Sequence, residues 1–447
     1  MLTLALNSVR QRPGRFLATA LSAFLGAVIT MTFNSLHDTA VAADTDAAGS
    51  ETLHLTASVV GGYGTLLVFF AIASALTVNV RQRAEEIRLL RCTGATPSQI
   101  RLMVVGEAVA VALIGLLAAV GPAMLAGRAL LEMFRDTDQV ADDVTYTFGP
   151  VAVAAGVTTV LVASAGAAFL AVRRATRAAA GAGAGARRHR LRLLGGVAAL
   201  LIGTASAATT FAMDAGGPEL MAPPAYGAIV LSVAFAAFSP ALLRVVPARL
   251  EGLVTAVAGV SGYLAVHSVR QRATQLAGVL MPLIVFTGVA TATLSMQAAE
   301  NDALDASGVT RSVEDKNLET LNLVVVGIIV VFACVMLINS LYAATSYRGP
   351  EFGRQRLAGA VPGQVLTAVG TEAALLTVVG VFFGTIAALA GTVPFTLVRT
   401  DRVLPEQAPW IWLGTVAIGA VATVVTSVAT ARRSLRTPAV IAARVVS

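Results

Sequence analysis

Charged residues are scarce in this sequence, and their scarcity decides the class of protein. Only 13% of the 447 residues are charged, whereas 56% are hydrophobic, and the mean hydropathy is +0.78. Soluble proteins carry a charge on about 25% of their residues, so the composition excludes an ordinary soluble domain. We therefore expect an integral membrane protein built entirely from α-helices.

Cysteine and recognisable catalytic motifs are also scarce, which excludes several kinds of site. The two cysteines, Cys92 and Cys334, have no cysteine nearby, so we predict neither a disulfide nor a metal site. No Gly-rich phosphate loop ending in Gly-Lys-Ser or Gly-Lys-Thr is present. No nucleophile or acid–base pair stands out either, and we expect a non-catalytic chain that binds no cofactor itself.

Long uncharged stretches are abundant by contrast. A transmembrane helix needs about 20 predominantly apolar residues, and ten stretches reach this length. They lie at residues 16–34, 59–80, 104–126, 149–172, 193–213, 225–243, 274–296, 321–346, 366–393 and 409–430. The first has no convincing cleavage site, so we interpret it as a retained helix and not as a signal peptide.

Positive charge lies mainly on one side of these ten stretches. If the N-terminus is cytoplasmic, 26 of the 32 Lys and Arg residues fall in cytoplasmic segments and six in outer segments. Basic residues favour cytoplasmic loops, so we expect a multi-pass protein of the bacterial cytoplasmic membrane with both termini in the cytoplasm. The net charge of +7 then reflects membrane orientation, and we expect no nucleic-acid binding.

Two short polar sequences occur twice. Residues 7–12, Asn-Ser-Val-Arg-Gln-Arg, return at 267–272 as His-Ser-Val-Arg-Gln-Arg. Residues 93–100, Thr-Gly-Ala-Thr-Pro-Ser-Gln-Ile, return at 358–365 as Ala-Gly-Ala-Val-Pro-Gly-Gln-Val. The sequence therefore indicates a duplicated half, and its repeated polar parts are the parts expected to meet a partner.

The repeats divide the chain into three parts. We predict a first four-span repeat at 1–172, two central spans within 173–250, and a second four-span repeat at 251–447. Six spans separate the start of one repeat from the start of the other, so both cross the membrane in the same direction, as parallel repeats. The apolar spacing within 251–272 predicts an amphipathic helix along the inner membrane surface.

The polar loop after the second predicted span contains a charged helix followed by a tight turn. Gly94 stands where that helix would end, and Thr96-Pro97 is typical of the start of the next helix. The same turn returns in the second half at an offset of 265 residues, where Gly359 and Pro362 match Gly94 and Pro97. We interpret each loop as a rigid lever at the cytoplasmic surface.

The charges of the two levers match as well. The charged residues assigned to the levers are Glu85, Glu86, Arg88 and Arg91 in the first and Arg348, Glu351, Arg354 and Arg356 in the second. In the second lever, Gly349-Pro350 is expected to interrupt the helix, and Gly353 replaces Arg88. We therefore expect the second lever to make the weaker partner contact.

Two carboxylates, Glu107 and Glu372, also match at the offset of 265 residues. Each lies about ten residues beyond its proline, near the start of a predicted span. A carboxylate inside a membrane is costly and is usually paired or functional. The sequence leaves two roles open for them, structural pairing with an arginine at the membrane surface or a direct part in gating.

The stretch from Glu86 to Ile100, followed by Glu107, resembles the signature of FtsX-like (MacB-type) ABC transporter permeases. In that family the stretch is the coupling helix that docks on a separate ATPase. The resemblance implies that Glu85, Glu86, Arg88 and Arg91 contact the ATPase and that Gly94 to Pro97 form the turn. It further implies an ABC ATPase partner, in two copies per chain, that binds ATP and Mg²⁺. Membrane lipids are the other expected partner.

The resemblance covers both four-span repeats, and the ten-span layout is similar to permeases of the bacitracin-detoxification type. Those permeases carry a large extracellular domain after the seventh span, where this chain has only about 24 residues between predicted spans. A MacB-type periplasmic domain after the first span is missing too. These departures count against tripartite efflux and lipoprotein extraction.

Three functions remain open. The first is the membrane subunit of an ABC exporter that exports or extracts an amphipathic substrate such as an antibiotic or a lipid, as in antibiotic efflux and resistance. The second is an ATP-driven mechanical transmitter that regulates a cell-wall hydrolase or a sensor kinase without transport. The third, an ion-coupled secondary transporter, is disfavoured because no predicted span carries a charge near its centre.

Overall fold

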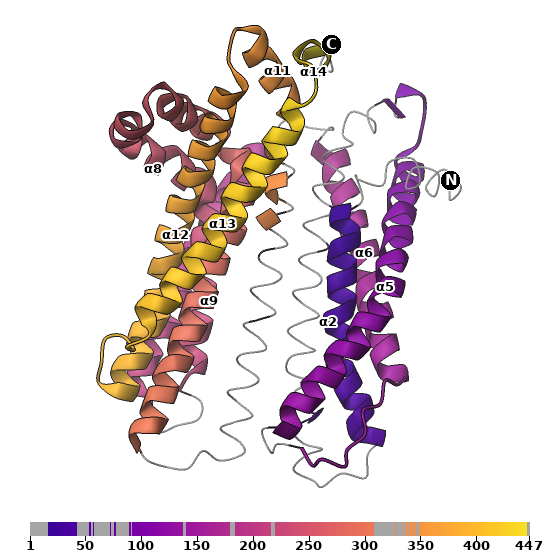
Figure 1. The fold of residues 1–447 in the computed structure, drawn as a ribbon, viewed down its shortest axis with the longest axis vertical. Helices are drawn as coiled ribbons and strands as arrows, with labels where there is room; N and C mark the ends of the chain where they lie inside the picture. Colours follow the sequence, from indigo (N-terminus) through magenta and orange to yellow (C-terminus); the bar gives the residue numbers. More distant parts are fainter. Residues whose placement is uncertain are drawn as a thin grey trace. The chain divides into compact units, whose positions relative to one another are not determined.

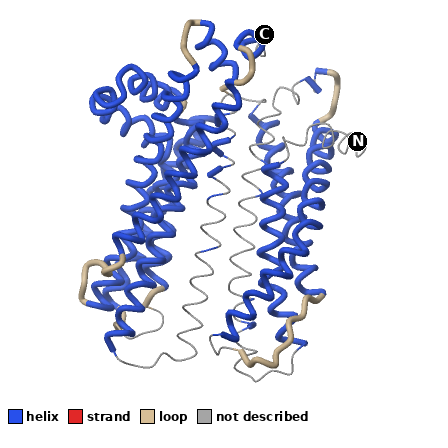
Figure 2. Tube along the Cα trace, viewed as in Figure 1, coloured by secondary structure: helices blue, strands red, loops and turns tan. Residues whose placement is uncertain are grey.

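All the regular secondary structure of the described residues is helical. The computed structural model describes residues 17–42, 92–136, 140–178, 184–215, 220–307 and 348–444, and isolated positions between 53 and 90 and between 327 and 345. Within these residues no strand is present (Figure 2). The prediction of an all-α fold is confirmed.

Eight of the described helices are long and apolar enough to cross a membrane. They lie in α2 (Leu17–Ala42), α5 (Pro97–Asp136), α6 (Pro150–Ala178), α7 (Ala184–Thr209), α8 (Ala222–Gln271), α9 (Ala273–Ser307), α12 (Pro362–Thr400) and α13 (Ala408–Leu435). The shorter elements are the 3-10 helix η2 (Thr210–Ala212), α11 (Gly349–Leu357) and α14 (Ala439–Arg444). These eight helices correspond to eight of the ten predicted spans. The other two, 59–80 and 321–346, lie largely outside the described residues.

The described helices pack into two compact units. One unit contains α2, α5 and α6, and the other contains α7, α8, α9 and α11 to α14 (Figure 1). In the first unit, α2 lies against both α5 and α6. In the second, α9 is the most buried of the long helices and contacts α8, α12 and α13. The two central helices, α7 and α8, thus pack with the helices of the second repeat.

A buried carboxylate fixes one end of α6 to α2 in the first unit. Asp38 of α2 accepts hydrogen bonds from the backbone N–H groups of Gly149, Val151 and Ala152, at 3.1, 3.1 and 2.8 Å. The first N–H groups of a helix have no partner within the helix and attract negative charge. Asp38 therefore caps α6 from a position 111 to 114 residues earlier in the chain.

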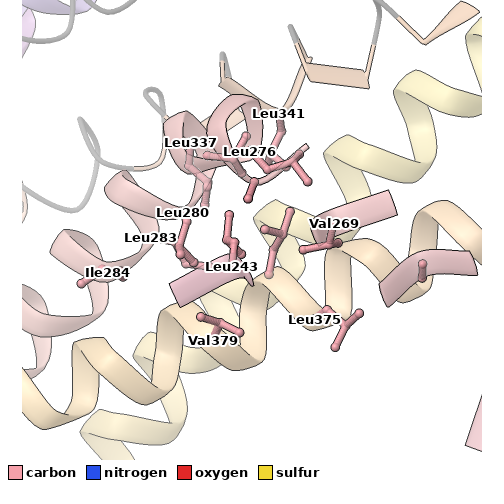
Figure 3. Close-up of a cluster of buried hydrophobic side chains, with 14 of the residues drawn as sticks. Leu243, Val269, Leu276, Leu280, Leu283, Ile284, Leu337, Leu341, Leu375 and Val379 are labelled. Atoms are coloured by element: carbon pink, nitrogen blue, oxygen red, sulfur yellow. The ribbon is translucent and has the colours of Figure 1, made fainter. Parts of the chain in front are cut away.

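The core of the second unit lies where α8, α9 and α12 meet. Figure 3 shows its leucine, isoleucine and valine side chains, which include Leu243, Val269, Leu280, Leu375 and Val379. Close to this core, α9 and α12 approach each other without room for a side chain. A Cβ atom on Gly384 would lie 2.6 Å from the Cβ of Thr287 and 3.1 Å from the backbone nitrogen of Gly288. Small residues of this kind let helices in a membrane pack backbone against backbone.

The C-terminal part of α8 folds back on itself at Gly259. This glycine has φ 56° and ψ −138°, a backbone conformation that is almost restricted to glycine. Glu251 and Arg270 approach to 3.8 Å across the bend, although a straight helix would hold them about 28 Å apart. Residues 244–271 therefore form a helical hairpin, called the α8 hairpin below. The prediction of one amphipathic helix over 251–272 is wrong in this respect.

Candidate functional site

The two predicted levers end in the same turn. Gly94 and Gly359 have φ angles of +93° and +99°, which a glycine adopts without the clash that a Cβ atom would cause. In each copy the residue after the glycine donates its N–H to the carbonyl five positions earlier, at 2.9 Å, in the pairs Ala95 to Leu90 and Ala360 to Gln355. This bond and the left-handed glycine define the Schellman ending of a helix. The predicted turns at Gly94 and Gly359 therefore exist in matching form.

The start of the following helix differs between the copies. Thr96 and Gln99 cap the start of α5 reciprocally, because the Thr96 N–H donates to the Gln99 side chain at 2.9 Å and the Gln99 N–H donates to the Thr96 hydroxyl at 3.3 Å. At the start of α12, the Val361 N–H donates to the Gln364 side chain at 3.0 Å. Valine has no side-chain oxygen, so the return bond to the side chain of the capping residue is missing at the start of α12.

Replacing either turn glycine with alanine should weaken its lever. We expect Gly94→Ala and Gly359→Ala to cost about 1–2 kcal/mol each, because an L-residue is strained in the left-handed region. An added Cβ meets no atom within 4 Å at either position, so the cost is conformational. Chemical denaturation in detergent measures it, and Gly359→Asn should recover part of the loss. The control is Gly363→Ala, in an equally open place with ordinary φ, and an equal loss there would contradict the assignment.

The helix of the second lever, α11, begins at Gly349 with Pro350 in its first turn. The expectation that Gly349-Pro350 interrupts this helix is wrong. Proline is tolerated in the first turn because its missing N–H would have had no partner there, and its fixed φ suits a helix. This removes one reason to expect that the second lever makes the weaker partner contact, and that expectation stays a prediction.

Four alternating charges connect α11 to two neighbouring segments. Arg348, the residue that precedes α11, binds Glu372 of α12 with both terminal nitrogens, one of them at 3.1 Å. Its Nε also donates to Glu351 of α11 at 3.2 Å. Glu351 in turn pairs with Arg272, in the turn between α8 and α9. Only 10% of the Arg348 side chain and 7% of the Glu372 side chain are exposed, so this pair is buried.

Burial and charge compete at two members of this network. Burial by itself would lower the pKa of Arg348, but the attraction of Glu372 and Glu351 outweighs it and raises the pKa. Burial would likewise raise the pKa of Glu351, but Arg348 and Arg272 outweigh it and hold the pKa below 4.5. The stabilisation from Glu351 is therefore present above the pKa of this carboxyl in the unfolded chain and is lost as the pH falls through its lower pKa in the folded state. Both groups are charged at neutral pH.

Further contacts join α11 to α13. Arg356 donates from Nη1 to the carbonyl oxygens of Leu435, the last residue of α13, and of Thr437, two residues beyond it, at 3.1 and 2.8 Å. Phe352 is buried, and the Arg348 guanidinium lies 5.1 Å from the centre of its ring. As a result α11 is fixed to α12, to α13 and to the turn before α9.

The structure thus divides the predicted lever residues into two groups. Arg348, Glu351 and Arg356 are bound within the chain, whereas Arg354 is exposed beside the exposed turn of Gly359 and Pro362. On the first lever, Gly94 and Thr96 are exposed and α5 begins at Pro97. Glu85, Glu86, Arg88 and Arg91 lie outside the described residues.

The two matched carboxylates are both buried, Glu107 on α5 and Glu372 on α12. For Glu372 the structure shows pairing with an arginine, and the partner is Arg348. A gating role for either carboxylate stays a prediction. Sequence reasoning placed Arg272 in a repeated polar sequence expected to meet a partner, whereas the structure pairs it with Glu351 within the chain.

Comparison with known proteins now decides the family. A model of the FtsX-like permease C-terminal domain matches residues 58–180 and 323–439, together more than half of the chain. The two matches begin 265 residues apart, the separation of Gly94 and Gly359. The chain belongs to the FtsX-like permease family. No curated protein matches the chain.

As an FtsX-like permease, the chain is a multi-pass membrane protein and the permease component of an ABC-type system. Permeases of this family are generally non-catalytic membrane subunits that work with ABC ATPases. Among the described residues, no three His, Cys, Asp or Glu side chains gather in a way that could hold a metal ion. In the described site, charged side chains attach the short helix α11 to the long apolar helix α12 and to the turn before α9.

Proposed function

We propose that this permease couples ATP hydrolysis by a separate ATPase to the export or extraction of an amphipathic substrate, such as an antibiotic or a lipid. Two ATPase copies, each holding ATP and Mg²⁺, would dock on the two levers at the cytoplasmic face of a bacterial membrane. The observation that carries the proposal is the attachment of α11 to α12, α13 and the turn before α9. A force on α11 therefore reaches three long helices.

A side-chain contact at each attachment would transmit such a force. Arg348 transmits it to α12 through Glu372, Arg272 transmits it to α9 through Glu351, and Arg356 transmits it to α13. Ion pairs that are mostly buried resist displacement, because separating them would leave an uncompensated charge away from water.

The far ends of α9 and α12 are tied together as well. Arg399 of α12 binds both carboxylate oxygens of Glu300 on α9, at 2.9 and 2.7 Å, and donates to the carbonyl of Ala215 at 2.7 Å. A bidentate pair of this kind fixes both distance and orientation. A movement that begins at α11 would thus be carried to the opposite ends of these helices, where a substrate path could open.

Reconstitution with an ABC ATPase that co-purifies with the permease tests the proposal. ATP hydrolysis should rise with the transported compound among candidate antibiotics and lipids, and that compound should cross or leave the membrane. Hydrolysis that responds to no amphipathic compound, but to a cell-wall hydrolase or a sensor kinase, would favour the mechanical transmitter and contradict the transport proposal.

Removing the lever charges of the first repeat should detach the ATPase. We expect the double variant Glu86→Ala and Arg91→Ala to lose co-purification with the ATPase, because both charges belong to the predicted contact surface. A matched control removes one Arg and one Glu elsewhere, in the variant Arg402→Ala with Glu406→Ala, whose side chains form an exposed ion pair. Co-purification that persists in the first variant would overturn the lever assignment.

A further inference from the structure

The α8 hairpin presents an apolar tip that no other described residue covers. Val257 and Val260, on either side of the bend at Gly259, are 84% and 76% exposed. Leu253 and Leu264 next to them are also exposed. In Figure 1 this part of α8 lies across the long direction of its bundle. A protruding tip of this composition is unfavourable in water.

The hairpin starts and ends on helices that cross the membrane. Its first residue, Arg244, follows directly on the predicted span 225–243. After its last residue, Gln271, only Arg272 precedes α9. Both ends are therefore held at the membrane surface, within a few residues of the lipid headgroups. This position favours the bilayer over a soluble protein as the surface that covers the tip.

The charge of the hairpin favours an anionic surface. Arg244 and Arg249 are exposed, and Arg270 is half-exposed beside Glu251. Residues 244–272 contain four arginines and one glutamate, so the hairpin and its foot are cationic. An apolar segment flanked by arginines is the combination that binds a bilayer with anionic headgroups.

We infer that the α8 hairpin is a membrane brace that inserts Val257 and Val260 among lipid acyl chains and binds anionic headgroups through Arg244 and Arg249. At the foot of the brace, Arg272 holds Glu351 of α11. Anionic lipid would therefore steady the second lever and raise the efficiency with which it transmits force. This last step rests on the proposed function, whereas insertion of the tip does not.

Insertion is measured on the permease alone. In a background in which Cys92 and Cys334 are replaced by alanine, Val257→Cys carries an environment-sensitive fluorophore in nanodiscs of phosphatidylcholine and phosphatidylglycerol. Acyl-chain-brominated lipid should quench this label and aqueous iodide should not. The control is Val361→Cys, a valine that is 58% exposed in the turn after α11 and should show the reverse. Equal iodide quenching at both positions would overturn the brace.

The headgroup contact is measured with Arg244→Gln and Arg249→Gln. Each arginine near an anionic surface should favour the inserted state about fivefold, so the double variant should insert poorly even with phosphatidylglycerol. Insertion that is the same with and without phosphatidylglycerol would overturn the headgroup contact.

The link to the lever has a separate readout. With the ATPase present, substrate-stimulated hydrolysis should fall when phosphatidylglycerol is omitted, and the double arginine variant should not respond to it. If the label at residue 257 does not insert but the substrate still stimulates ATP hydrolysis, the brace is wrong and the proposed function stands. If the tip inserts but substrate-stimulated hydrolysis is the same with and without phosphatidylglycerol, the link between the brace and α11 is overturned.

Discussion

Arg348→Ala is expected to lower the free energy of unfolding by about 3–5 kcal/mol, the range found when one partner of a buried ion pair is removed. The variant leaves the buried carboxylate of Glu372 without its ion-pair partner. It also takes one of the two arginines away from Glu351. Chemical denaturation in detergent measures the loss, and ATPase coupling should disappear with it.

Two further variants separate an effect on folding stability from an effect on ATPase coupling. Arg402→Ala removes an arginine from an ion pair whose side chains are 59% and 79% exposed, and it should cost less than about 1 kcal/mol. Arg348→Met combined with Glu372→Leu replaces both buried charges by apolar groups, which is often neutral for stability. We expect that double variant to fold and to remain uncoupled. Full coupling in it would show that the ion pair transmits nothing.

Gly384→Leu is expected to cost about 3 kcal/mol, the upper part of the range for an overpacked core. The Cβ atom alone would lie 2.6 Å from the Cβ of Thr287 and 3.0 Å from the carbonyl oxygen of Ile284, and neither atom is the end of a flexible side chain. The backbones of α9 and α12 must therefore separate. Because the ties at both ends of these helices require the close approach, ATPase coupling should be lost along with stability.

Gly370→Leu is the matched control for this substitution on the same helix. A Cβ at Gly370 meets no atom within 4 Å, and leucine favours a helix more than glycine does. We expect stability to be unchanged or slightly raised and coupling to be retained. Equal damage from the two substitutions would mean that the cost is a general effect of leucine in α12 and not of contact with α9.

The features that the sequence predicted well depend on local signals. Gly94 and Gly359 were recognised because a glycine before a proline-led helix is a local ending signal, and both have the expected left-handed φ. The eight described spans follow from apolar length alone, which a bilayer imposes on any crossing helix. The family resemblance also rested on one continuous stretch, from Glu86 to Ile100.

The features that the sequence missed depend on residues far apart in the chain. Arg272 and Glu351 are 79 positions apart, and Asp38 caps α6 from more than 100 positions away. Nothing local shows which distant residue each of them pairs with. The reversal at Gly259 was missed because a glycine within an apolar stretch is compatible with a continuous helix. Gly349-Pro350 was misjudged because the same dipeptide can end a helix or begin one.

We expect α11 and α12 to move as one body because Arg348 and Glu372 hold them together. Spin labels at Arg354→Cys on α11 and Phe382→Cys on α12, both exposed, measure the distance between these helices when the cysteines at 92 and 334 are replaced. We predict one narrow distance distribution that is unchanged when the bound ATPase is trapped with ATP, and that broadens in Glu372→Ala. A shift on ATP trapping with Glu372 intact would mean that α11 swings independently of α12, and would contradict the account.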